Sequence, residues 1–148
     1  MDASIGFEGE ETHKLKDDDI DAAQIEDLEP RTLSDEDVRR VVDSLHLTAE
    51  WKARLDKLVR LAVRLGGRVV RVGMRILEVI LETMKQYPMT SAALIVGGVL
   101  TLLAAHVPVL GLLLAPLVAT ITVATSTLTF AAEQALRIRE QFRAFTQS

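Results

Sequence analysis

Residues 86–132 read QYPMTSAALIVGGVLTLLAAHVPVLGLLLAPLVATITVATSTLTFAA, a run without a single Asp, Glu, Lys or Arg. A helix needs ~20 apolar residues to cross a bilayer, so this run is too long for one crossing and fits two crossings joined by a tight turn. It therefore predicts an all-α membrane protein built on a two-pass transmembrane helical hairpin. A buried hairpin outside a membrane is the less favoured alternative, because helices of that kind usually carry a polar face.

The turn of this hairpin is predicted at residues 106–108, where Pro108 suits the first position of a second helix. The two spans then lie near 89–105 and 109–132, and Pro116 loosens the start of the second. A turn at residues 114–116 is the alternative register. His106, the one histidine in the run, is expected at a wetted interface rather than in mid-membrane.

The chain divides sharply by charge on either side of residue 50. Residues 1–50 hold 16 Asp and Glu against five Lys and Arg, whereas the rest of the chain is basic and the total is -4. Residues 1–31 are polar and acidic, so an acidic flexible segment is expected there. No apolar signal segment opens the chain, so residues 1–50 are expected to stay in the cytosol.

Residues 32–86 predict a cytosolic helical region that ends with a basic amphipathic helix. Ser34 and Asp37 indicate the start of one helix, and Thr48 indicates the start of the next. From Glu50 to Gln86 there is no proline, and Gly66-Gly67 is expected to bend a long helix. Six cations recur at helical spacing and are predicted to line one face, where they contact anionic lipid or another polyanion: Lys57, Arg60, Arg64, Arg68, Arg71 and Arg75.

The cations around the uncharged run set the expected orientation. The basic helix precedes the first span, and a basic C-terminal juxtamembrane helix over 133–148 follows the second. Under the positive-inside rule both flanks face the cytosol, which predicts a multi-pass protein of the cell membrane with both termini cytoplasmic. Aromatic residues are absent from the cationic face, which argues against sequence-specific binding of nucleic acid.

Small and hydroxyl side chains recur along the predicted second span and form a helix-packing or pore seam: Ala115, Ala119, Thr122, Ser126 and Thr129. Packing against the first span of the same chain, contact within a homo-oligomer and the lining of a narrow pore are three interpretations of this seam.

No catalytic or metal-binding motif is visible, so an enzyme and a cofactor are not expected. The chain has no Cys, and its three His residues lie in different segments. Asp17, Asp19 and Asp21 imitate the start of a calcium loop, but Ala22 and Leu28 occupy positions that need Gly and Glu.

The leading functional hypothesis is a small homo-oligomeric integral membrane protein that forms a pore or ion channel. In layout alone it is similar to membrane effectors of bacterial anti-phage defence, with the acidic N-terminal segment holding it inactive, and to holin-like membrane-permeabilising proteins. The competing hypothesis is a membrane anchor or accessory subunit that recruits a cytosolic partner. Expected partners are the lipid bilayer, further copies of the chain, and an anionic ligand or a cytosolic protein.

Overall fold

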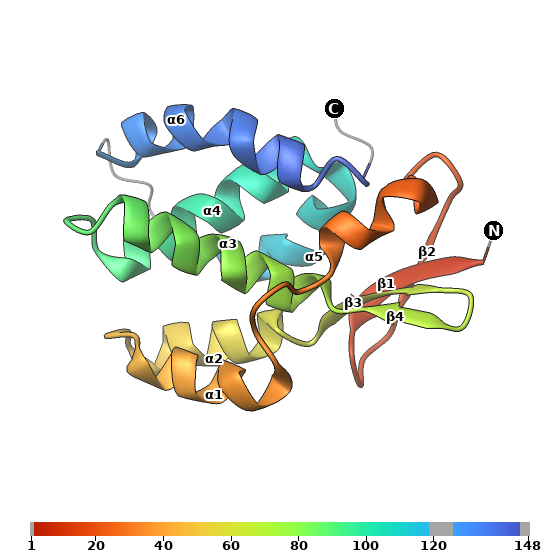
Figure 1. Ribbon diagram of the computed structural model, residues 1–148, viewed down its shortest axis with the longest axis horizontal. Coiled ribbons are helices and arrows are strands. Elements are labelled where there is room, and N and C mark those ends of the chain that lie inside the picture. The colour runs from red at the N-terminus through yellow and green to blue at the C-terminus, as the bar shows by residue number, and fades with distance from the viewer. Residues whose placement is uncertain (1, 119–125, 146–148) are drawn as a thin grey trace.

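A four-stranded antiparallel sheet and several helices pack around one core in the computed structural model (Figure 1). The structure describes residues 2–118 and 126–145, with the backbone alone for residues 126–132.

The elements follow one another along the chain as two strands, three short helices, a β-hairpin and four longer helices. The strands are β1 (Ala3–Phe7), β2 (His13–Leu15), β3 (Leu61–Leu65) and β4 (Arg68–Val70). The helices are the 3₁₀ helix η1 (Ala22–Leu28), α1 (Asp35–Ser44), α2 (Ala49–Leu58), α3 (Val72–Gln86), α4 (Ala92–His106), α5 (Pro108–Val118) and α6 (Ser126–Gln141).

The sheet joins the N-terminal segment to the middle of the chain. Its strand order is β2-β1-β3-β4, so β1 pairs with β3 across more than fifty residues, with Ile5 opposite Val63 and Ser4 opposite Arg64. Side chains alternate between the two faces of a strand. Ile5 and Val63 are fully buried on the face toward the helices, whereas Arg64 is exposed on the other face.

Gly66 and Gly67 form the turn of the β3–β4 hairpin rather than a bend in a helix. Gly66 has a φ of 62°, a left-handed conformation that glycine adopts without steric cost. Val63, Val69 and Val70 flank the turn, and β-branched residues favour strands. The predicted continuous helix from Glu50 to Gln86 is therefore wrong, since a hairpin separates α2 from α3.

The predicted helix starts are confirmed at α1 and α2. The N–H and hydroxyl of Ser34 donate hydrogen bonds to the Asp37 carboxylate at 3.3 and 2.9 Å. The Thr48 hydroxyl accepts a hydrogen bond from the N–H of Trp51 at 3.3 Å. α3 ends just before Pro88, as the sequence predicts.

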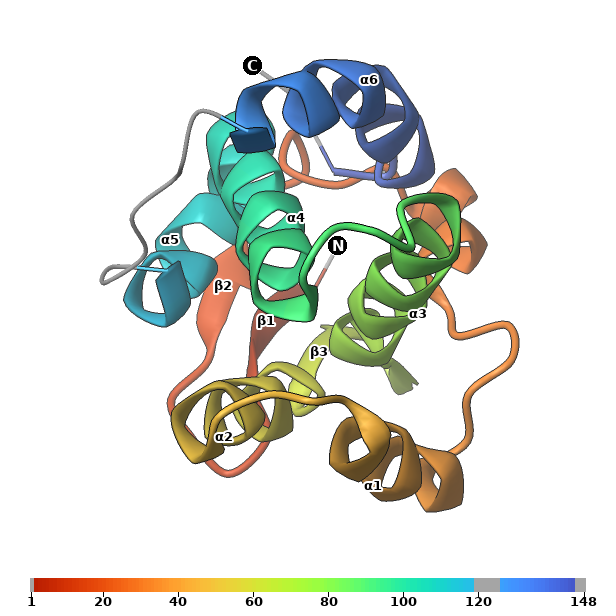
Figure 2. The ribbon, with the colours of Figure 1, turned by 90° about the vertical axis from the view of Figure 1, so that its left-hand side faces the viewer.

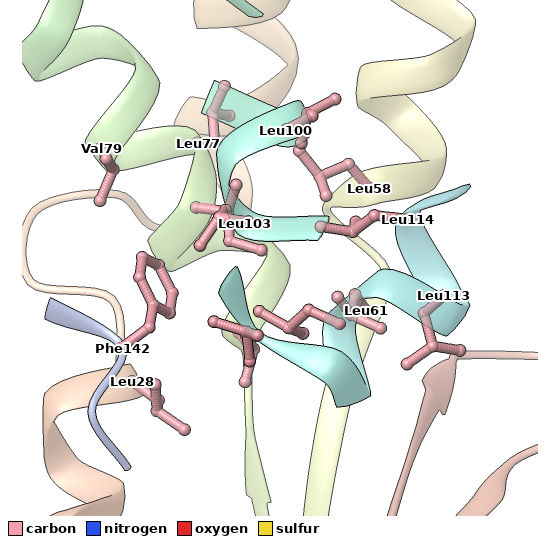
Figure 3. Packing of buried hydrophobic residues seen from close by; sticks show 14 of the residues in the cluster. Leu28, Leu58, Leu61, Leu77, Val79, Leu100, Leu103, Leu113, Leu114 and Phe142 are labelled. Atoms are coloured by element: carbon pink, nitrogen blue, oxygen red, sulfur yellow. The ribbon is translucent and has the colours of Figure 1, made fainter. Parts of the chain in front are cut away.

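The core is centred on α4, which contacts α3, α5 and α6 (Figure 2). Leu100 and Leu103 of α4 lie among Leu77 of α3, Leu58 of α2 and Leu114 of α5 (Figure 3). A helix that is apolar on every side is buried, either in a membrane or at the centre of a fold. Here intramolecular packing buries much of the apolar surface of residues 92–118.

The predicted all-α membrane protein with a two-pass transmembrane hairpin is contradicted by this architecture. Within the described ranges, no helix combines the length and the apolar character that a membrane crossing requires. α4 has 15 residues and α5 has 11. At 1.5 Å per residue they measure about 22 and 16 Å, against ~30 Å for the hydrocarbon core of a bilayer. The chain does turn at the predicted place, since α4 ends at His106 and α5 begins at Pro108.

The other membrane features expected from the sequence are corrected with it. Membrane insertion, a two-pass topology, transmembrane helices and a pore or ion channel were all expected because the apolar run fits two spans. Instead, α4 and α5 pack inside a mixed fold of helices and sheet. The acidic tail contributes β1, β2 and η1. A buried face therefore gives order to a segment whose composition alone favoured disorder.

Candidate functional site

A buried carboxylate on α3 holds the segment that links η1 to α1. Glu78 is 7% exposed. Its two oxygens accept hydrogen bonds at 2.9 Å from the N–H of Arg31, and one of them also accepts from the N–H of Leu33 at 2.9 Å. The N–H and hydroxyl of Thr32 donate to the same oxygen. Residues 31–33, which we call the strap, are thereby fixed across α3, as Figure 1 shows for the segment that leads into α1.

These hydrogen bonds determine the charge state of Glu78. Burial raises the pKa of its carboxyl, but the backbone donors of Thr32, Arg31 and Leu33 together outweigh burial, so the pKa lies below its usual value. Glu78 is therefore an ionised carboxylate whose acceptor sites are largely used by the strap, which suits it to a structural role rather than to proton transfer.

Arg75 lies one helical turn before Glu78 and is also buried, at 3% exposed. Its guanidinium reaches the Asp27 carbonyl at 3.4 Å and the Glu78 and Gln141 side chains at 3.5 Å each. These contacts join η1, α3 and α6. Burial lowers the pKa of Arg75, and the charge of Arg31 lowers it further.

The strap separates two cavities on this side of the molecule. One, of about 550 Å³, lies between α1 and α3 and is lined by apolar and charged side chains: Arg31, Thr32, Val41, Ser44, Arg75, Glu78, Leu81, Glu82 and Lys85. The other, of about 490 Å³, is lined by Leu33, Arg71 and Met74 among others. The buried Nε of Arg71 has no hydrogen-bond partner within the described residues.

The six predicted cations do not share one helical face. Lys57 lies in the last turn of α2, Arg64 and Arg68 lie on β3 and β4, and Arg71 precedes α3. Arg60 stands between α2 and β3, and Arg75 is buried.

Acidic residues from the N-terminal part of the chain pair with several of these cations. Glu10 pairs with Lys57 at 3.6 Å, and Glu29 pairs with Arg68 at 2.7 Å. Arg71 lies 3.7 Å from Glu8 and 3.0 Å from Asp35. Arg60 and Arg64 are exposed and form no ion pair with any described residue.

The predicted packing seam is only partly visible. Ala115 is exposed on α5. Ala119 and Thr122 lie outside the described residues, and Ser126 and Thr129 belong to α6, where the backbone alone is described. The structure therefore does not bring the five residues together as a described surface.

The acidic residues of the imitated calcium loop have other roles. The Asp19 carboxylate accepts a hydrogen bond from the Lys16 N–H at 2.9 Å, and Asp21 accepts one from the Ala23 N–H at 3.0 Å. Across the part of the chain that the structure describes, no three His, Asp or Glu side chains are grouped so that they could hold a metal ion.

The pairing of Arg75 with Glu78 was not predicted from the sequence. The sequence does carry a signal for it, since Glu78 interrupts the apolar run Ile76-Leu77-Glu78-Val79-Ile80. A charge inside such a run faces the core and requires a charged or hydrogen-bonding partner. The strap as that partner was not predictable, because it lies more than forty residues away in the sequence.

A model of the family described as "Protein of unknown function (DUF1614)" matches residues 23–147, more than four-fifths of the chain. No curated protein and no solved structure matches it.

Proposed function

We propose that this chain, which belongs to the DUF1614 family, is a non-catalytic accessory protein that pairs with a second copy of itself through the outer face of α5. The outer face of α5 consists of Pro108, Leu112, Ala115 and Pro116, all of which are exposed. One observation carries the proposal: a large apolar side chain, Leu112, is 66% exposed at the centre of this uncharged face.

The outer face follows from the way α5 packs. Leu110, Leu113, Leu114 and Leu117 are buried on the inner side, and α5 contacts α4 extensively. Positions 108, 112, 115 and 116 have the spacing of a single helical face, so they turn away together. Scattered exposed apolar residues are common on proteins, but a helix without any charge on its solvent side is a feature of contact surfaces.

The absence of charge favours a second copy as the occupant. A twofold interface places the same residues opposite each other, so any charge near the axis meets its like. The outer face of α5 avoids this repulsion in a chain with 38 charged residues. Next to it, a cavity lined by Leu112 and Pro116 also includes Glu10 and Lys57, which supply a polar rim.

Its small size sets the expected strength of the dimer. α5 has 11 residues, or about 16 Å of helix, whereas stable complexes bury about 800 Å² on each partner. A weak, concentration-dependent dimer with a dissociation constant on the order of micromolar is therefore expected.

The accessory-subunit hypothesis does not depend on a membrane hairpin, unlike the pore and holin hypotheses.

Analytical ultracentrifugation of the full chain tests the proposal. Leu112→Arg places two cations across the axis and is expected to weaken the dimer at least tenfold. Leu136→Arg is the matched control, since Leu136 is a similarly exposed leucine (74%) on α6. Equal association of both variants and the wild type, or a wild type that stays monomeric at high concentration, contradicts the proposal.

A further inference from the structure

The cavity between α1 and α3 contains an incompletely satisfied cation at one end. A guanidinium has five N–H donors, and Arg75 uses three of them at 3.4–3.5 Å. Charge-assisted hydrogen bonds are normally shorter, near 2.7–2.9 Å. Glu78, the one carboxylate that Arg75 contacts, has its oxygens occupied by the strap. The buried positive charge is therefore poorly compensated.

A second cation lies at the same end. Arg31 lines the cavity from the strap, and its charge disfavours the charge on Arg75. Arg31 is exposed, and its side chain forms no ion pair with any described residue. The other carboxylate in the cavity wall, Glu82, favours the charge on Arg75 but is itself paired with Arg137 of α6. An anion between the two guanidinium groups would remove their repulsion and supply the missing acceptors.

We propose that the end of this cavity formed by Arg31 and Arg75 binds a small oxyanion, of the phosphate or carboxylate class. Planar guanidinium groups match such groups with paired hydrogen bonds. The cavity volume of about 550 Å³ accommodates a small molecule that carries the anionic group. Val41 and Leu81 of the same cavity wall offer apolar contact to the rest of such a molecule.

Lys85 provides an internal control in the same cavity. It lies on α3 ten residues after Arg75, which places its backbone about 15 Å farther along the helix. Arg31→Gln and Lys85→Gln each remove one exposed positive charge from the cavity wall. Arg31→Gln keeps the backbone N–H that donates to Glu78, so the strap stays attached.

Isothermal titration calorimetry of the full chain with inorganic phosphate, and separately with acetate, at constant ionic strength tests the site. Saturable phosphate binding is expected, weakened at least about tenfold by Arg31→Gln and little changed by Lys85→Gln. Binding of phosphate alone assigns the site to phosphate groups, and binding of both assigns it to oxyanions in general. Absence of saturable binding, or equal weakening in both variants, overturns the proposal.

Thermal denaturation distinguishes a lost contact from a damaged fold. Without ligand, Arg31→Gln is expected to melt at the temperature of the wild type or above it, because it removes a repulsive charge near Arg75. Added phosphate is expected to raise the melting temperature of the wild type and of Lys85→Gln, but not that of Arg31→Gln. Equal stabilisation of all three forms by phosphate contradicts the site.

Discussion

At the scale of single residues, the buried pair of Arg75 and Glu78 shows why a charge can remain inside this fold. An ionised side chain loses its hydration on burial, and only close partners offset that loss. Glu78 has such partners, because three backbone N–H groups and one hydroxyl of the strap donate to it. Arg75 has only long contacts of 3.4–3.5 Å, so its charge is less well compensated than the charge of Glu78.

Glu78→Gln is expected to destabilise the protein by about 3 kcal/mol at neutral pH, since breaking a buried charge pair strands its partner. The amide also has one acceptor oxygen where the carboxylate has two. The folded pKa of Glu78 is below its unfolded value, so its stabilisation is present above an unfolded pKa of about 4.3 and is lost as pH falls through the folded pKa. Urea denaturation at several pH values measures the free energy of unfolding of the wild type and of Glu78→Gln.

The difference in unfolding free energy between the wild type and Glu78→Gln should therefore shrink in acid. Asp37→Asn is a suitable comparison, because hydrogen bonds from Ser34 also lower the pKa of the Asp37 carboxyl, which is exposed whereas that of Glu78 is buried. A difference that stays constant from neutral pH to below pH ~3 would show that Glu78 does not act through its charge.

At the scale of elements, local signals predicted the starts of α1 and α2, the end of α3 and the turn before Pro108, because capping residues and proline act over a few residues. Ser34, Thr48 and Pro108 all stand where the sequence indicates. The β3–β4 hairpin was missed although Gly66-Gly67 between two valine-containing runs is a hairpin signal. The cations at 57–75 also have helical spacing, and that periodicity favours a helix across the glycines.

The apolar run was misassigned for a different reason. Composition cannot distinguish a helix buried in lipid from one buried by neighbouring helices. The neighbours that cover α4 include α3 and α6, which lie outside the run. Of the candidate site, Arg75 was among the cations identified from the sequence, but Arg31, the cavity and the strap were not, because they depend on contacts between distant segments.

Gly73→Ala tests the junction of α2 with α3. A Cβ at Gly73 would lie 1.8 Å from the carbonyl oxygen of Leu58, so the two helices must separate to admit it. The loss of stability is expected to reach about 1–3 kcal/mol or more, as for other overpacked sites. Gly67→Ala is the control, since no atom lies within 4 Å of its Cβ position. Equal melting temperatures for the two variants would show that the helices move apart freely.

At the scale of the whole molecule, the two oppositely charged parts of the chain meet. Ion pairs such as Glu29 with Arg68 and Asp35 with Arg71 join the acidic part of the chain to the basic part. What the sequence did not show is that β1 inserts between β2 and β3. Each exposed pair contributes only about 0–1 kcal/mol, so the strand and its buried side chains hold the N-terminal segment in place.

Deletion of residues 2–31 distinguishes these two contributions. The charge argument alone predicts a folded remainder released from restraint, whereas the structure predicts loss of cooperative unfolding. The deletion removes β1, β2 and η1 with their buried side chains, uncovers the edge of β3 that pairs with β1, and takes one backbone donor from Glu78. An edge without its partner strand also leaves N–H and C=O groups of β3 unpaired.

Circular dichroism and thermal denaturation of the deleted chain measure the outcome, which is expected to be a broad transition or none. Lys57→Gln combined with Arg68→Gln is the matched comparison, because it removes two ion pairs and keeps every strand. That variant should lose no more than about 2 kcal/mol and, like the wild type, should unfold cooperatively at high salt, where exposed pairs are screened. If the deleted chain unfolds as sharply as the wild type while the double variant does not, then charge pairing rather than the sheet holds the N-terminal segment.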